Sequence, residues 1–129
     1  MQEFAFIFGG AFGFIAVVLG AFASHLLKKR WPKDLIDSFE IGVKYQMYHA
    51  LYLVLLGQIL PMDSTTAKLS VVFSIIGTLL FSGSIYGICM LKNQKKPIKL
   101  LGPITPLGGL CLLLSWLFFI TTVLYSYEY

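Results

Sequence analysis

The sequence contains little charge, and its charged residues are confined to short segments. Of its 129 residues only 12% are charged, whereas 57% are hydrophobic, and the mean hydropathy is +0.80. Such values lie far outside the range of a water-soluble domain. They exclude a soluble globular protein and indicate one integral membrane domain.

Four long stretches carry no charged side chain at all. A helix rises about 1.5 Å per residue and the hydrocarbon core of a bilayer is about 30 Å thick, so a span needs roughly 20 apolar residues. In the last stretch Thr105 suits an N-cap and Pro106 a first helical position, which leaves residues 100–104 irregular. The sequence therefore predicts an all-α integral membrane four-helix bundle, with spans at about 4–27, 45–62, 69–91 and 106–126.

Cysteines and buried carboxylates are also scarce. Cys89 and Cys111 lie inside apolar stretches without CxxC spacing, which excludes a disulfide framework and a zinc site. No carboxylate lies inside a predicted span, and no Ser-His-Asp or HExxH arrangement is present. We therefore expect no enzymatic activity, no metal and no cofactor. The basic residues lie beside spans and are not interleaved with exposed aromatics, so we expect no nucleic-acid partner either.

Lysine and arginine are absent from both termini and concentrate in two loops. The second loop has only Lys68, whereas the other two loops hold nine basic residues: Lys28, Lys29, Arg30, Lys33, Lys44, Lys92, Lys95, Lys96 and Lys99. Short loops rich in Lys and Arg remain in the cytoplasm. We predict a multi-pass protein of the cell membrane, expected to be the bacterial cytoplasmic membrane, with both termini on the non-cytoplasmic side.

The first loop also contains a helical pattern. Pro32 can occupy a first helical turn, and apolar residues recur at helical spacing in the segment that follows: Leu35, Ile36, Phe39 and Val43. Charged residues fall largely on the other face. The pattern predicts a short amphipathic helix at about 33–44 that lies along the membrane surface before the second span.

Polar side chains inside the spans gather toward one leaflet. An ionisable residue at the centre of a span costs about 2.5–3.5 kcal/mol, and the spans contain only His25 and His49. The predicted span ends place both in the cytoplasmic half, together with polar groups of all four helices. The candidate ligand-binding residues are His25, Tyr45, Gln46, His49, Ser82, Ser84, Tyr86 and Thr105.

Three interpretations of this cluster are open. Each residue could have a structural role, as an interfacial tyrosine, a histidine extended to the headgroups or an amide bonded to a neighbouring carbonyl. The cluster could also form a polar pocket for a small ligand, a lipid headgroup or a proton. Alternatively, His25 and His49 could be the axial ligands of a haem.

Small residues form stripes on two of the predicted helices. The first helix has Gly9, Gly13, Ala16, Gly20 and Ser24 on one face. The third has Ser70, Ser74, Gly77 and Ser84, with Gly83 and Gly87 as an additional pair. Small residues let membrane helices approach closely, so we interpret both stripes as packing contacts.

Four short runs resemble a known family. They are 20–25 (GAFASH), 42–51 (GVKYQMYHAL), 80–86 (LFSGSIY) and 104–109 (ITPLGG), the last followed by Trp116. Together they resemble the small four-helix membrane family of unassigned function that includes the bacterial YgdD and YwdK proteins. The chain departs from the family pattern at 23–26 (ASHL in place of Gly-Ala-His-Gly) and at Ser115, where a glycine commonly precedes the tryptophan. The resemblance implies a fold and a membrane location but no reaction.

We expect a non-enzymatic multi-pass membrane protein that acts through association with membrane lipids, other membrane proteins or a second copy of itself, with a polar pocket in the cytoplasmic leaflet. A small transporter or channel for a neutral or small solute is the alternative, and it requires a hydrated path through both leaflets. A haem- or quinone-binding redox subunit is the third possibility.

Overall fold

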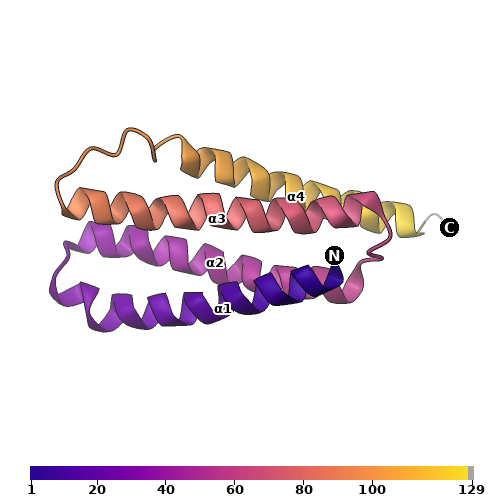
Figure 1. The fold of residues 1–129 in the computed structure, drawn as a ribbon, viewed down its shortest axis with the longest axis horizontal. Coiled ribbons are helices and arrows are strands. Elements are labelled where there is room, and N and C mark those ends of the chain that lie inside the picture. The colour runs from indigo at the N-terminus through magenta and orange to yellow at the C-terminus, as the bar shows by residue number, and fades with distance from the viewer. Residues whose placement is uncertain (128–129) are drawn as a thin grey trace.

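Four long antiparallel helices make up the part of the protein that the structure describes (Figure 1). The computed structural model describes residues 1–127, and its helices are α1 Gln2–His25, the short 3-10 turn η1 Leu27–Lys29, α2 Lys33–Ile59, α3 Thr65–Asn93 and α4 Ile104–Tyr127. Residues 1–127 contain no strand, and the predicted all-α four-helix fold is confirmed. The two basic connections, 26–32 and 94–103, lie at one end of the molecule, which we call the basic end, and the N-terminus and the connection 60–64 lie at the other.

Helices that follow one another in the chain pack on one another. In Figure 1, α2 and α3 occupy the middle, with α1 beside α2 and α4 beside α3. Leu53, Leu56 and Val71 are fully buried between the helices, and they pack with Phe12 of α1. Many large apolar side chains remain exposed on the outer faces, Phe14 to 72%, as expected of helices that lipid surrounds.

Within residues 1–127, three helices are long and apolar enough to cross a membrane: α1 with η1, α3 and α4. α2 is less apolar but has 27 residues and packs beside both α1 and α3. Its length of about 40 Å exceeds the roughly 30 Å of a bilayer core. A helix of this length can cross the membrane together with the other three helices. Part of its charged first half then extends beyond the hydrocarbon core at the basic end.

The predicted amphipathic helix at 33–44 is helical but not separate, because it continues without a break into α2. Leu35, Ile36 and Phe39 do not lie on a membrane surface; they are buried against the other helices. The thiol of Cys89 on α3 contacts the carbonyl of Leu35 at 3.6 Å. Because Leu35, Ile36 and Phe39 are buried inside the protein, the segment 33–44 can continue straight into the second span, and the chain does not turn before residue 45. The predicted second span, 45–62, is therefore the later part of one long helix that ends at Ile59.

α4 begins two residues earlier than predicted, at Ile104 instead of Pro106. The carbonyl of Pro103 accepts a hydrogen bond from the N–H of Leu107, so Pro103 opens the helix. Pro106 then lies in the first turn of α4, where backbone N–H groups have no partner within the helix. A proline, which has no N–H group, therefore loses no helical hydrogen bond there. Thr105 lies inside the helix, and its hydroxyl group bonds to α3.

Glycines set how closely the helices approach. A Cβ atom on Gly9 would lie 2.9 Å from the carbonyl oxygen of Ala50, and one on Gly108 would collide with the backbone of Phe81. Gly83, by contrast, faces open space. The small residues of the predicted stripes therefore make close helix contacts at some positions, such as Gly9. Gly83, for which a contact was predicted, makes none.

Candidate functional site

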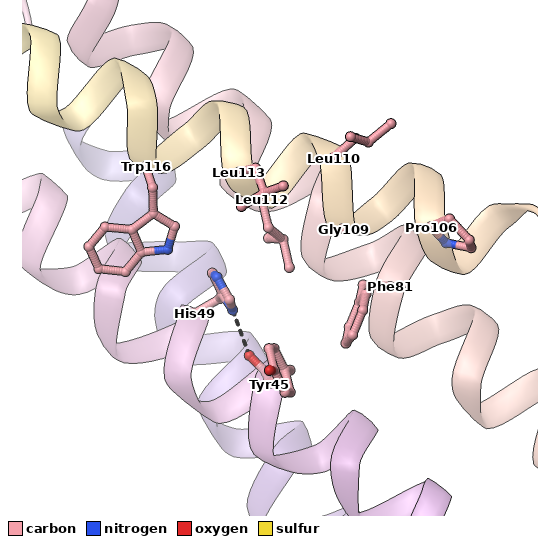
Figure 2. Close-up of a pocket in the computed structure, with 9 residues that line it drawn as sticks. All are labelled: Tyr45, His49, Phe81, Pro106, Gly109, Leu110, Leu112, Leu113 and Trp116. Atoms are coloured by element: carbon pink, nitrogen blue, oxygen red, sulfur yellow. Dashed lines mark hydrogen bonds between the residues drawn. The ribbon is translucent and has the colours of Figure 1, made fainter.

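A groove of about 570 Å³ lies between α2, α3 and α4 (Figure 2). Most of its wall is apolar, and α4 supplies the greater part of it. The lining residues are Tyr45 and His49 of α2, Phe81 of α3, and Pro106, Gly109, Leu110, Leu112, Leu113 and Trp116 of α4. The groove is thus an apolar recess with one imidazole and one phenol in its wall.

The imidazole of His49 is the distinctive polar group of the groove. Its side chain is 6% exposed, and Nδ1 lies 2.8 Å from the carbonyl oxygen of Tyr45, one turn earlier in α2. Nε2, on the far side of the ring, is buried and has no hydrogen-bond partner. Figure 2 shows the ring between the Tyr45 carbonyl and the α4 leucines. Because a carbonyl only accepts, Nδ1 carries the hydrogen, and a neutral ring leaves Nε2 as a free acceptor.

Aromatic rings hold His49 in place. The ring of Tyr45 stacks on the imidazole at a centroid distance of 6.4 Å, and Tyr52 meets it edge-on at 5.9 Å. Tyr52 in turn stacks on Trp116 at 4.1 Å, and Phe81 packs against Tyr45 at 4.9 Å. The aromatic part of the groove wall is therefore held together by ring contacts between three helices, with Tyr52, which does not line the groove, joining His49 to Trp116.

A hydrogen-bond network fixes α4 beside the groove. Ser115 donates to the backbone carbonyl of Ser70 at 2.6 Å, and the Ser70 hydroxyl donates to the carbonyl of Ser115 at 2.9 Å. The Tyr52 hydroxyl donates to the same Ser115 carbonyl at 3.2 Å. Ser115, where the chain departs from the resembled pattern, thus joins α3 and α4 through reciprocal bonds.

Gln46 joins three helices on the other side of α2. Its Nε2 donates to the carbonyl of Phe12 on α1 at 2.9 Å, and its Oε1 accepts from the Tyr86 hydroxyl on α3 at 2.7 Å. The side chain is 5% exposed, and both polar atoms are paired. Gln46 and Tyr86 border a smaller cavity of about 210 Å³, but their hydrogen bonds are already used within the protein.

The remaining hydroxyl groups also bond between helices. Ser82 donates to the carbonyl of Gly42 on α2 at 2.7 Å. Ser84 and Thr105 lie with their hydroxyl oxygens 2.6 Å apart, which links α3 to the first turn of α4. Three of the eight candidate residues thus tie helices together and leave no polar atom unpaired.

His25 lies apart from the other candidates, exposed at the end of α1. Gly20 packs against Val43, and continuing this antiparallel register places His25 opposite Ser38, about 16 Å along the axis from His49. One iron atom cannot bind two imidazoles that are so far apart. Among residues 1–127, no three side chains of His, Cys, Asp or Glu lie together as a metal site would require.

The eight candidates therefore do not share one pocket. Tyr45 and His49 line the large groove, Gln46 and Tyr86 the smaller cavity, and His25 neither. His49 lies inside α2, about 8 Å along the axis from Lys44. Because α2 begins at Lys33 instead of residue 45, His49 lies about 24 Å from the first residue of α2 and about 15 Å from its last.

The sequence prediction missed Tyr52, Phe81, Trp116 and the leucines of α4. Tyr52 follows His49 by three residues and so shares its helix face, which is a signal that was present in the sequence. Phe81 and the α4 residues carry no such signal, because apolar side chains are spread around both helices and only the packing determines which of them face α2.

The chain matches the family described as "Protein of unknown function (DUF423)" over residues 19–109. It is 38% identical over 107 residues to the UPF0382 membrane protein C1782.12c of Schizosaccharomyces pombe, which covers 81% of this chain and 87% of that one. It is 36% identical over 115 residues to the UPF0382 membrane protein YwdK of Bacillus subtilis, with 86% and 88% covered. Identity is also 36% over 118 residues to the UPF0382 inner membrane protein YgdD of Escherichia coli K12, with 89% and 85% covered. No solved structure matches the chain.

The matches agree with the four sequence runs and with the long apolar helices. The relatives are named as membrane or inner membrane proteins, and the chain aligns with most of their length. The protein is a multi-pass membrane protein, and it belongs to the DUF423 family of UPF0382 membrane proteins.

Proposed function

We propose that the protein is a non-enzymatic membrane protein that binds an amphipathic molecule from the bilayer in the groove between α2, α3 and α4. The observation that carries the proposal is the buried Nε2 of His49, which has no hydrogen-bond partner in the wall of an apolar groove. A buried polar atom without a partner costs about 1–3 kcal/mol. A bound molecule that supplies the missing bond offsets this cost.

The dimensions of the groove support a small-molecule site. Such sites are typically about 300–1,000 Å³, mostly apolar, with a few polar groups that set orientation. The groove holds about 570 Å³ and is open on the α4 side, where Leu110 is 57% exposed and Leu113 67% exposed. These side chains face the region that lipid fills, so the molecule enters from the bilayer and not from water.

The chemistry of the lining residues favours binding over catalysis. The ionisable side chains in the wall are those of Tyr45 and His49, and no carboxylate, thiol or amine joins them. General acid–base or nucleophilic catalysis by a histidine usually involves a second polar group that orients it or reacts with it. Here the second nitrogen of His49 is bound to a backbone carbonyl of its own helix.

A solute path through the centre of the helices is less well supported. Leu53, Leu56 and Val71 fill the interior, and Gln46 bridges α1 and α3 across it. We therefore place transport of a neutral solute second. For orientation, we propose that the basic end faces the cytoplasm, because nine of the ten Lys and Arg residues belong to it or to the first half of α2.

The test is lipid retention by three forms of the full chain: the wild type, His49→Leu and His25→Leu. Each is purified from membranes in mild detergent, and the bound molecules are identified by native mass spectrometry. We expect the wild type and His25→Leu, whose substituted residue lies outside the groove, to retain a bound species that His49→Leu loses. Equal retention by all three forms, or none by the wild type, would contradict the proposal.

A further inference from the structure

We infer that the polar group of the bound molecule is a neutral hydroxyl group, an alcohol or a phenol on an apolar body, which donates a hydrogen bond to Nε2 of His49. This inference rests on the binding function proposed above and adds the chemical class of the ligand. It also gives the ligand a direction: the hydroxyl group lies at His49, and the apolar body extends along α4 toward the lipid.

The hydrogen-bond direction follows from the position of the imidazole proton. Nδ1 faces the carbonyl oxygen of Tyr45 at 2.8 Å, and this oxygen can only accept. The proton therefore lies on Nδ1, and Nε2 of the neutral ring presents a lone pair. A ligand whose only polar atom is an acceptor, such as an ether or a ketone, cannot pair with it.

A charged ligand group does not suit this place. The groove wall contains no charged partner for a ligand ion, because Lys44, which precedes His49 by about 8 Å along α2, does not line the groove. Burying an unpaired ion costs far more than burying a hydroxyl group that is hydrogen-bonded. Phosphate headgroups therefore remain near the basic end, where lysines concentrate, and a neutral lipid-soluble alcohol or phenol fits at His49.

The apolar body has a matching surface. Trp116 is 45% exposed and stacks on Tyr52 with one face, while Leu110 and Leu113 form the open side. Nε2 itself is covered, so the hydroxyl group reaches it when the groove leucines change rotamer. Leu113, at 67% exposure, has room to do so.

The experiment compares two probes of which only one carries a hydrogen-bond donor; the other has a methyl group in place of the hydroxyl hydrogen. One is a 4-alkylphenol with bromine on two adjacent chain carbons away from the ring, and the other is its methyl ether. The chain has two tryptophans, so Trp31→Phe leaves Trp116 as the only one, in the groove wall. Bromine quenches tryptophan at short range. Quenching of Trp116 is titrated in lipid vesicles, with excitation where the phenol does not absorb.

We expect saturable quenching by the phenol at a membrane concentration about fivefold lower than by the ether, since one hydrogen bond contributes on the order of 1 kcal/mol. His49→Leu should remove the difference between the probes. His49→Gln should retain part of it, because the amide oxygen can accept near the position of Nε2. The comparison of phenol with ether uses the Trp31→Phe protein, which keeps His49, so it does not depend on whether the variants at position 49 fold.

Two results would overturn the inference, and they separate it from the proposed function. If phenol and ether quench equally and saturably, the groove binds ligands but selects no donor, so the inference fails and the function stands. If neither probe quenches saturably, both fail.

Discussion

The hydroxyl group of Tyr86 on α3 donates a hydrogen bond of 2.7 Å to Oε1 of Gln46 on α2. The other end of the same amide donates to the carbonyl of Phe12, so one side chain joins α1, α2 and α3. The bond leaves Gln46 without a free polar atom, whereas His49, three residues later, keeps one. This contrast separates a structural polar residue from a candidate binding residue.

Tyr86→Phe should destabilise the protein by about 0.6–1 kcal/mol, because Oε1 of Gln46 loses its donor in an apolar surrounding. The measurement is unfolding in mild detergent with increasing sodium dodecyl sulfate, followed by circular dichroism. Tyr48→Phe is the matched control, since Tyr48 is 58% exposed on the same helix as Gln46. Equal stability of the two variants would show that the bond contributes nothing measurable.

Gly108→Ala should be more damaging, by about 1–3 kcal/mol, because the added Cβ meets the backbone of Phe81 and Leu80 and must push α4 away from α3. The same unfolding assay measures it. Gly109→Ala is the control, since the nearest atoms lie 3.8 Å from its Cβ position. If both variants unfold alike, the close approach of α3 and α4 at Gly108 is incorrect.

Orientation can be tested with reporter fusions that are active on only one side of the membrane. Fusions after Lys29 and after Lys95, both at the basic end, should report the cytoplasm, and one at Asp63 should report the other side. An external position for Lys95 would contradict the orientation that the Lys and Arg distribution predicts.

Much of the fold could be predicted because charge marks the helix ends. The four apolar stretches correspond to four helices, and the polar residues Gln46, His49, Ser82 and Ser84 are buried in the structure. The length of α2 could not be predicted in the same way. Its charged first half is typical of a surface helix, and only the packing of Leu35 and Phe39 inside the protein shows that the helix is continuous.

The site could be predicted only in part. Spacing along one helix indicates which residues lie near one another on it, but it does not tell which helix lies opposite each of them. Tyr86 lies opposite Gln46, whereas α4 lies opposite His49, so neighbouring residues serve different interfaces. That partition depends on the register between helices, which close contacts such as that of Gly108 with Phe81 help to set.

The central claim is that Nε2 of His49 is a free acceptor that a hydroxyl-bearing ligand occupies. The most direct measurement is solid-state nitrogen NMR of the protein in lipid vesicles with ¹⁵N-labelled histidine, with His25→Leu used to assign the signals of His49. We predict a neutral ring with hydrogen on Nδ1, and an Nε2 resonance that shifts when the alkylphenol is added but not when its methyl ether is added. Hydrogen on Nε2, or an Nε2 resonance that the phenol leaves unchanged, would contradict the claim.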